Sequence, residues 1–318
     1  MDRYSRQELY RNIGKAGQKK ISESTVSVVG MGALGTVAAE LLARAGVGNL
    51  ILIDRDFIEL NNLQRQSLFD ESDIGKLKAE TAAEKLRKIN AEVKITAKNI
   101  DMTFENISGI GNPDIILGCT DNMESRFLLN DYALKNKIPF VYGGAVSDRG
   151  YVFNVVHGGA CLRCIFKGST EETCDTVGVL NANTAAVAAI MSNEAIKIIL
   201  GKDYEKNLVR IDFWKNDFSK IKVAQNKDCP ACTGKYEYLS GERKSSLVRM
   251  CEKGSYQIRG RKKDLAAVEK NLKKLGEVKM FNGLLHFGSI TLFEDGRALV
   301  KAENETEARK IYDRIIGN

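Results

Sequence analysis

A glycine-rich turn between a strand pattern and a helix pattern constrains the fold of this chain more than any other feature. The β-branched run Thr25 to Val29 ends in Gly30-Met31-Gly32-Ala33-Leu34-Gly35, and an alanine-rich helical stretch continues to about Ala45. A second apolar run, Leu50 to Ile53, then closes on Asp54. Strand, glycine turn, helix and strand in this order predict an α/β fold with a Rossmann-like doubly wound sheet.

The same unit predicts a nucleotide pocket. Gly30, Gly32 and Gly35 let the backbone turn tightly and approach a phosphate group, and the helix N-terminus presents free N–H groups to its oxygens. Asp54 stands where an acid at a strand end can hold ribose hydroxyls. The motif alone is typical of nicotinamide and flavin dehydrogenases.

Positive residues on both sides of the turn favour a different use of the pocket. Arg6 precedes the first strand, Arg65 lies within Asn62-Leu63-Gln64-Arg65-Gln66, and Lys78 follows soon after. A dehydrogenase needs little positive charge around one pyrophosphate, whereas an enzyme that breaks a triphosphate must stabilise charge on the leaving group. Together these cations indicate an ATP-using enzyme, although each one singly fits a solvated loop.

An acid follows the next buried strand. Asp114 to Gly118 reads as that strand, and it runs into Cys119-Thr120-Asp121-Asn122. The carboxyl ends of parallel strands are where α/β sheets bind ligands, so Asp121 is a candidate for holding Mg²⁺ against phosphate oxygens. Its alternative role is to cap the following helix, and the two roles can coexist.

Four of the seven cysteines form two C-x2-C pairs, Cys161 with Cys164 and Cys229 with Cys232. Four thiolates at this spacing can surround one Zn²⁺ tetrahedrally and leave no open position for catalysis. A redox-active C-x-x-C needs only one pair, so the doubled pattern favours a structural zinc site that ties distant segments together. Cys174 is unpaired at a predicted loop-to-helix boundary, where it is either an activated nucleophile or an inert small residue.

The sequence also bears on where in the cell the protein resides. We find neither a signal-peptide pattern nor a run of ~18 apolar residues. The expectation is a soluble cytoplasmic protein without a membrane segment, and the cytosol keeps thiols reduced, in accord with metal-binding cysteines.

These motifs resemble the MoeB, ThiF and HesA family of sulfur-carrier adenylyltransferases, which are related to ubiquitin-activating enzymes. The similarity spans residues 3 to 238 and includes Arg3-Tyr4-Ser5-Arg6-Gln7, the glycine turn, the motifs at 62 to 66 and 119 to 122, and both cysteine pairs. It implies adenylation, with ATP and Mg²⁺, of the terminal glycine of a ubiquitin-like sulfur carrier ending in Gly-Gly, with release of pyrophosphate. It also implies a homodimer and, because no rhodanese domain is recognisable, a separate sulfur donor.

The resemblance also implies roles for single residues. Catalytic roles fall to Arg65 and Lys78 on the triphosphate, Asp121 on Mg²⁺, Arg6 on the partner subunit's nucleotide, and Cys174 as the site of a covalent link in some members. Nucleotide-binding roles fall to the three glycines, Asp54, Asp56, Asn62 and Asn122. No general base is required, because the attacking carboxylate is already ionised at neutral pH.

The last part of the chain follows a different pattern. We expect residues 1–240 to form the ATP-binding domain with the four-cysteine zinc site, and residues 241–318 to form a small basic α+β domain. In the latter, strands at 256–259, 278–287 and 290–300 with helices at 264–275 and 303–316 suggest a ferredoxin-like β-α-β-β-α order. The 17 Lys+Arg against 11 Asp+Glu in this region fit several roles equally: docking of an acidic carrier, binding of RNA or DNA, a dimerising or stabilising appendage, or a solvated surface.

Two other functions compete with carrier adenylation. A relative that adenylates a small molecule or a tRNA base would also use the pocket, and a basic tail would suit RNA. The cysteine pairs argue against it, because the tRNA-modifying branch of the superfamily generally lacks them. A nicotinamide-binding oxidoreductase or an inactive scaffold is the third possibility.

Overall fold

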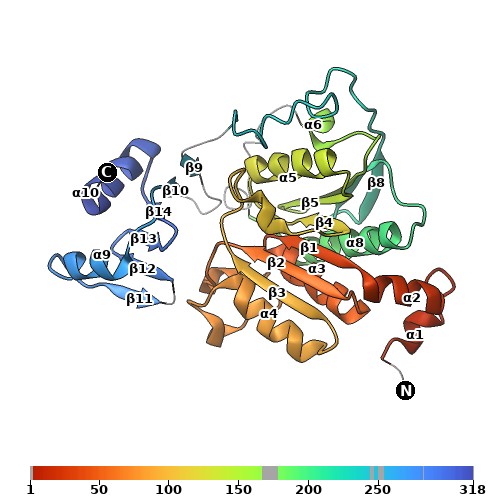
Figure 1. Cartoon of the computed structure of the whole chain (residues 1–318), viewed down its shortest axis with the longest axis horizontal. Helices are drawn as coiled ribbons and strands as arrows, with labels where there is room; N and C mark the ends of the chain where they lie inside the picture. Colours follow the sequence, from red (N-terminus) through yellow and green to blue (C-terminus); the bar gives the residue numbers. More distant parts are fainter. Residues whose placement is uncertain (1–2, 167–177, 244–246, 250–253, 282, 318) are drawn as a thin grey trace. The chain divides into compact units, whose positions relative to one another are not determined.

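The computed structural model describes residues 3–166, 178–243, 247–249, 254–281 and 283–317 (Figure 1). The chain divides into two compact units, Met1–Arg243 and Lys244–Asn318, each with its own sheet.

The first unit is built on an eight-stranded sheet in the order β3-β2-β1-β4-β5-β6-β7-β8. Its strands are β1 (Thr25–Val29), β2 (Asn49–Asp54), β3 (Lys94–Asn99), β4 (Ile115–Gly118), β5 (Phe140–Val146), β6 (Arg149–Val155), β7 (Leu208–Asp212) and β8 (Asp217–Ile221). The strands from β3 to β5 pair in parallel, and β6 to β8 continue the sheet antiparallel. The Rossmann-like sheet predicted from the glycine turn is confirmed, and the chain reverses its direction of winding between β1 and β4.

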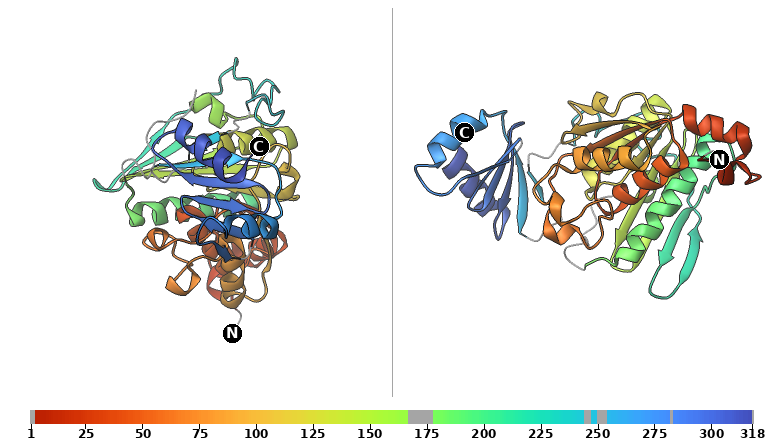
Figure 2. Two further views of the ribbon diagram at one scale, coloured as in Figure 1. Left: turned by 90° about the vertical axis from the view of Figure 1, so that its left-hand side faces the viewer. Right: turned by 90° about the horizontal axis from the view of Figure 1, so that it is seen from below.

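Helices cover both faces of this sheet (Figure 2). They are α1 (Ser5–Glu8), α2 (Gly14–Glu23), α3 (Ala33–Ala45), α4 (Lys78–Ile89), α5 (Met123–Asn136), α6 (Leu162–Ile165) and α8 (Asn181–Ile199), with 3-10 turns η1 (Leu60–Asn62), η2 (Glu71–Asp73) and η3 (Ile107–Ile110). The hydrophobic core of one face holds residues of α3, α4 and α8, and the core of the other holds residues of α5 and the cysteine segments. Each central strand is buried on both sides, which explains its nearly continuous apolar sequence.

The first strand–helix unit forms where its sequence predicts. Ala38, Ala39 and Ala43 are fully buried in α3, where their small side chains allow close packing. The helix ends at Gly46, which adopts the left-handed conformation that favours glycine at a helix C-terminus. The later alanine-rich helix α8 begins at Asn181.

The second unit is an α+β fold, as expected, but its elements do not follow the expected β-α-β-β-α order along the chain. Its elements are β9 (Leu247–Arg249), β10 (Ser255–Arg259), α9 (Leu265–Leu272), β11 (Lys279–Phe281), β12 (Leu284–Phe287), β13 (Ile290–Phe293), β14 (Arg297–Lys301) and α10 (Glu305–Ile316). They form an antiparallel sheet in the order β11-β12-β13-β14-β10-β9. Each of the two long strands expected at 278–287 and 290–300 is instead a hairpin, because Gly283 and Gly296 adopt positive φ at a reversal of the chain.

The helices of the second unit pack on the sheet through an apolar core of their own. Leu265 and Leu272 of α9 and Ala308 and Tyr312 of α10 lie in one cluster with Leu292 of β13. Within the described part of the chain, no helix is both long enough and apolar enough to span a membrane.

Candidate functional site

The three glycines of the turn have different surroundings. Gly30 has a φ of +97°, and a Cβ atom there would lie 2.6 Å from the carbonyl oxygen of Cys119. A Cβ on Gly35 would lie 1.8 Å from the carbonyl oxygen of Gly30. At Gly32, the N-cap of α3, the nearest atom would be Gln66 Nε2 at 3.9 Å. Gly30 and Gly35 therefore close the turn on itself, whereas Gly32 borders open space where a ligand can approach.

Asp54 ties the glycine turn to the end of β2. Its Oδ2 accepts a hydrogen bond from the backbone N–H of Met31 at 2.5 Å, and its Oδ1 accepts one from that of Asp56 at 2.7 Å. Burial raises the pKa of Asp54, and the charge of Lys78 opposes this rise. A carboxylate has about four acceptor positions, so Asp54 keeps capacity for ribose hydroxyls after these two bonds.

Lys78 is the cation around which the predicted acids gather. It is the first residue of α4, it is 8% exposed, and its Nζ lies 3.7 Å from Asp56 Oδ2. Burial alone would lower its pKa, but the carboxylates of Asp56, Asp54 and Asp121 outweigh burial and raise it. The side chain therefore stays an ammonium at neutral pH, beside the three acids that the sequence singled out.

The structure separates the two roles considered for Asp121. The N-cap of α5 is Asn122, whose side-chain oxygen accepts a hydrogen bond from the backbone N–H of Ser125 at 2.8 Å. Asn122 Nδ2 also donates to Asp121 Oδ1 at 3.3 Å. Asp121 is thus exposed at the carboxyl edge of the sheet without capping the helix, an arrangement that suits a Mg²⁺ ligand.

Sequence reasoning missed a buried ion pair at this edge. Arg55 Nη1 lies 2.8 Å from Asp101 Oδ1, and its Nε lies 3.6 Å from Asp56 Oδ1. Although burial favours the neutral guanidine, the carboxylates of Asp101, Asp56 and Asp121 raise the pKa of Arg55. The signal was present, because Arg55 stands between two acids directly at a predicted strand end.

Three buried polar atoms around the turn lack a hydrogen bond within the described residues. They are Asp56 Oδ1, Gln66 Oε1 and Thr120 Oγ1. Buried polar atoms are nearly always satisfied in native proteins, so three such atoms near one glycine turn fit a polar ligand that completes the site. Gln66 is 3% exposed and ends the motif at 62 to 66, yet no sequence signal favours it over its neighbours.

The remaining predicted residues bond within their own segments or are exposed. Asn62 is buried, and its amide bonds with the backbone N–H of Glu59 and the side chain of Asn61. Arg65 is partly exposed and donates to the carbonyl oxygen of Asn61 at 2.9 Å. Arg6 is exposed on α1. Cys174 lies outside the described residues.

The two cysteine pairs meet in a single cluster. The sulfur of Cys161 lies 3.9 Å from that of Cys164, 3.6 Å from that of Cys229 and 3.5 Å from that of Cys232. All four ligand atoms lie within 4.8 Å of one another. A tetrahedral Zn²⁺ with bonds of about 2.3 Å requires sulfurs about 3.8 Å apart, so the cluster fits the ion.

The charge balance among the four sulfurs also favours a bound cation. Burial, and then the neighbouring sulfurs, raise the pKa of Cys161. Without a metal, this thiol would therefore remain protonated. Zn²⁺ would reverse the balance because it binds the thiolate form.

Helix α5 supports both cysteine segments through two adjacent buried residues. Asn130 Oδ1 accepts a hydrogen bond from the backbone N–H of Leu162 at 2.9 Å, between the first two cysteines. Asp131 Oδ2 accepts one from the backbone N–H of Tyr238 at 3.1 Å, after the second pair. Burial raises the pKa of Asp131 to about 6. The helix that begins beside Asp121 therefore also supports the four-cysteine cluster.

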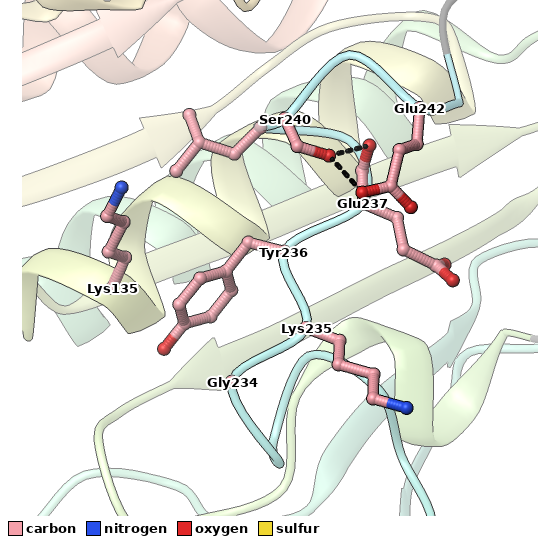
Figure 3. Close-up of a pocket in the computed structure, with 8 residues that line it drawn as sticks. Lys135, Gly234, Lys235, Tyr236, Glu237, Ser240 and Glu242 are labelled. Atoms are coloured by element: carbon pink, nitrogen blue, oxygen red, sulfur yellow. Dashed lines mark hydrogen bonds between the residues drawn. The ribbon is translucent and has the colours of Figure 1, made fainter.

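A cavity of about 390 Å³ lies beyond the second cysteine pair and has a different lining from the glycine turn. Figure 3 shows that the ammonium groups of Lys135 and Lys235 point in different directions, while Ser240 Oγ donates to Glu242 Oε1 at 3.0 Å. Because its two lysines do not converge and its hydroxyl is already bonded to a neighbouring carboxylate, this cavity is not the candidate site.

Comparison with known proteins identifies the group to which this architecture belongs. The profile of the ThiF family matches residues 4–231. The sulfur carrier protein ThiS adenylyltransferase of Bacillus subtilis is 40% identical over 99% of this chain and 99% of its own length. The molybdopterin-synthase adenylyltransferase of Escherichia coli is 35% identical over 73% of this chain and 96% of its own length. A crystal structure of E. coli MccB with MccA-N7isoASN is 25% identical and superposes with a TM-score of 0.66 over 73% of this chain and 75% of that one.

Proposed function

The chain belongs to the ThiF family, and from that premise we propose that it uses ATP to adenylate the C-terminal carboxylate of a small ubiquitin-like sulfur-carrier protein, releasing pyrophosphate. Relatives of this chain are named for that activity, including one that matches it over nearly its whole length. The observation that carries the proposal is the gathering of Asp54, Asp56 and Asp121 around the buried Lys78, beside a glycine turn with open space at Gly32.

In this reaction the residues of the site position the substrates and neutralise phosphate charge, and they transfer no proton. A carboxylate oxygen of the carrier attacks the α-phosphorus of ATP, the bond from that phosphorus to the bridging oxygen breaks, and pyrophosphate leaves with the electron pair. The carboxylate is already ionised, so no general base is needed. Lys78 and Arg65 would offset the charge that grows on the departing phosphates, and the free N–H groups at the start of α3 would face the phosphates at Gly32.

Two metal ions complete the proposal. Asp121 would hold Mg²⁺, which when bound neutralises phosphate charge, and magnesium sites of this kind use one or two carboxylates together with the phosphates. Zn²⁺ in the four-cysteine cluster would have a purely structural role, because all four coordination positions are filled by cysteine.

We propose two partners besides the carrier. A second copy of the chain would form a homodimer in which Arg6, exposed on α1, reaches the partner subunit's nucleotide. A separate protein would donate sulfur to the adenylated carrier. Both proposals rest on the family resemblance.

The second unit, Lys244–Asn318, contributes no residue to the reaction proposed above. It lies within the 99% of the chain matched by the Bacillus subtilis relative, whereas the E. coli relative matches 73% of the chain. We propose that its basic residues, which include Arg261, Lys262 and Lys263 ahead of α9, attract an acidic carrier. A stabilising or dimerising appendage is the alternative.

The main test is pyrophosphate exchange with defined acceptors. The protein is incubated with ATP, labelled pyrophosphate and either Bacillus subtilis ThiS or unmodified tRNA. We expect label to enter ATP only with ThiS, and ThiS lacking its last glycine serves as the control. Exchange driven by tRNA would replace the proposal with the tRNA-base alternative.

The docking role of the second unit is tested through salt dependence. Replacing Arg261 and Lys263 with serine should slow association with ThiS at low ionic strength and flatten its dependence on salt. Serine at Lys310 and Arg314 on α10 removes the same charge and serves as the matched control. An unchanged salt dependence in the first variant would leave the appendage alternative.

A further inference from the structure

Arg126 is a partly buried cation that has no role in the reaction proposed above. It lies in the first part of α5, and its Nε donates to the carbonyl oxygen of Thr120 at 3.0 Å. The guanidinium carbon lies 5.2 Å from the centroid of the Tyr142 ring. Tyr142 pairs with Gly118, the last residue of β4. The side chain is therefore held at the carboxyl edge of the sheet, where β4 ends beside β5.

The charge of Arg126 has no counter-ion in the described part of the chain. Two other arginines of the first unit each have one: Arg55 lies 2.8 Å from Asp101, and Arg163 lies 2.5 Å from Glu237. Among the described residues, Arg126 Nη1 has one hydrogen bond, to the sulfur of Met123 at 3.5 Å, and Nη2 has none. Sheltering a charge is costly unless it is paired, so this guanidinium fits a site that receives an anion from outside.

The place of Arg126 indicates which anion it receives. The glycine turn follows β1, and Lys78 pairs with Asp56 beyond the end of β2, so the predicted phosphate site lies on that side of the sheet. Arg126 stands on the other side of Asp121, toward β5. The reaction brings two anions to this edge, the nucleotide and the acceptor carboxylate. The proposed function already assigns Lys78 and Arg65 to the nucleotide, so the acceptor carboxylate is the anion left for a cation on the β5 side.

We propose that Arg126 binds the acceptor carboxylate, an inference that rests on the proposed function. A guanidinium is planar and carries several N–H donors, so it can hold one carboxylate oxygen while the other faces the α-phosphorus. That second oxygen forms the new bond to phosphorus, and pyrophosphate leaves with the electrons of the broken bond. Arg126 transfers no proton. It fixes the orientation of the nucleophile and favours a free carboxylate over a neutral C-terminus.

The test couples Arg126 to the carboxylate in a double-mutant cycle. Bacillus subtilis ThiS with a free C-terminus and ThiS with a C-terminal amide are titrated into the protein in the presence of a non-hydrolysable ATP analogue. In the unaltered protein, the amide should weaken binding about 10- to 100-fold, the range for a charged hydrogen bond. In Arg126→Gln the two forms should bind equally, and Arg126→Lys should give an intermediate difference.

Kinetics and a matched variant give independent readouts. Arg126→Gln should raise the KM for ThiS in pyrophosphate exchange and leave the dissociation constant of the ATP analogue unchanged. Arg44→Gln removes the same charge from the last turn of α3, at the opposite edge of the sheet, and should change neither quantity. Melting temperature and zinc content confirm that each variant is folded.

The possible results separate the two proposals. If the unaltered protein supports ThiS-dependent exchange, but amidation weakens ThiS binding as much in Arg126→Gln as in the unaltered protein, the role of Arg126 alone would be overturned. Weaker binding of the ATP analogue with an unchanged KM for ThiS would reassign Arg126 to the nucleotide. If the unaltered protein bound ATP but gave no exchange with any Gly-Gly carrier, the proposed function would fail, and the role of Arg126 would fail with it.

Discussion

At the scale of single residues, the space around each glycine distinguishes packing from ligand binding. Gly35 has no room for a side chain because a Cβ would overlap the carbonyl oxygen of Gly30, whereas Gly32 has a negative φ and open space around it. The two glycines are therefore required for different reasons. Gly35 is required by packing within the fold, whereas Gly32 leaves room for the nucleotide.

Alanine at these two glycines should separate the constraints. Gly35→Ala should destabilise the protein by about 3 kcal/mol or more, because backbone would have to move. Gly32→Ala should keep the melting temperature within a few degrees and weaken ATP binding, since the new methyl group would stand where the phosphates approach. Thermal unfolding and calorimetric titration measure the two effects. Equal loss of stability in both variants would contradict this distinction.

Asp121 offers a second test at this scale. Because Asn122 caps α5, Asp121→Ala should cost little stability, yet it should abolish carrier-dependent pyrophosphate exchange, a loss of at least about 10²-fold. Asp264 is the matched control: it caps α9 by accepting from the backbone N–H of Ala266, and its replacement by alanine should cost about 1 kcal/mol without affecting exchange. Near-normal exchange in Asp121→Ala would end the assignment of this acid to Mg²⁺.

At the scale of elements, α5 joins the two sites of the first unit. Its N-cap lies beside Asp121, and its buried residues Asn130 and Asp131 bond to the two cysteine segments. The four-cysteine cluster and the predicted magnesium ligand thus share one support, helix α5. We therefore expect a structural change at either site to alter the position of α5.

The raised pKa of Asp131 makes the stability of this support depend on pH. Its pKa of about 6, against an ordinary value of 3.8, means that the folded protein binds the proton more tightly than the unfolded chain. The stabilisation from protonated Asp131 is complete below pH 4 and is lost as pH rises to about 6. Asp131→Asn should therefore gain stability relative to the unaltered protein between pH 4 and 6, by at most about 3 kcal/mol, with a constant difference at higher pH. Urea unfolding of both proteins across this range measures the difference, and a constant difference throughout would contradict it.

Zinc content tests the cluster directly. We expect one zinc ion per chain, which should be lost in Cys229→Ser together with several degrees of melting temperature. Cys119 is buried outside the cluster and serves as the control, because Cys119→Ser should keep its zinc. Metal analysis by mass spectrometry provides the count, and a zinc-free native protein would contradict the assignment.

At the scale of the whole molecule, the proposed homodimer predicts complementation between inactive subunits. If Arg6 acts on the partner's nucleotide, Arg6→Ala and Asp121→Ala homodimers should each be inactive. Exchange of their subunits should then create one intact site in each mixed dimer. Such a mixture should recover about a quarter of the normal exchange rate, because half of the dimers are mixed and each has one working site of two. No recovery would place Arg6 in its own subunit's site.

The sequence by itself determined the local units of this protein. The β-branched run before the glycines, the alanines after them and the spacing of the cysteine pairs each act over a few residues, so strand β1, helix α3 and the cluster ligands could be predicted without a structure. In the second unit, the glycines at 283 and 296 marked chain reversals that the expected strands passed over.

Only the tertiary structure decided which distant side chains share a charge or a bond. Arg55 meets Asp101, Asn130 and Asp131 bond to the cysteine segments, and Arg126 stands without a counter-ion among the described residues, and none of these facts has a local signal. The physical reason is that pairing, burial and pKa depend on contacts between residues far apart in the chain, which exist only after the sheet has brought its carboxyl ends to one edge.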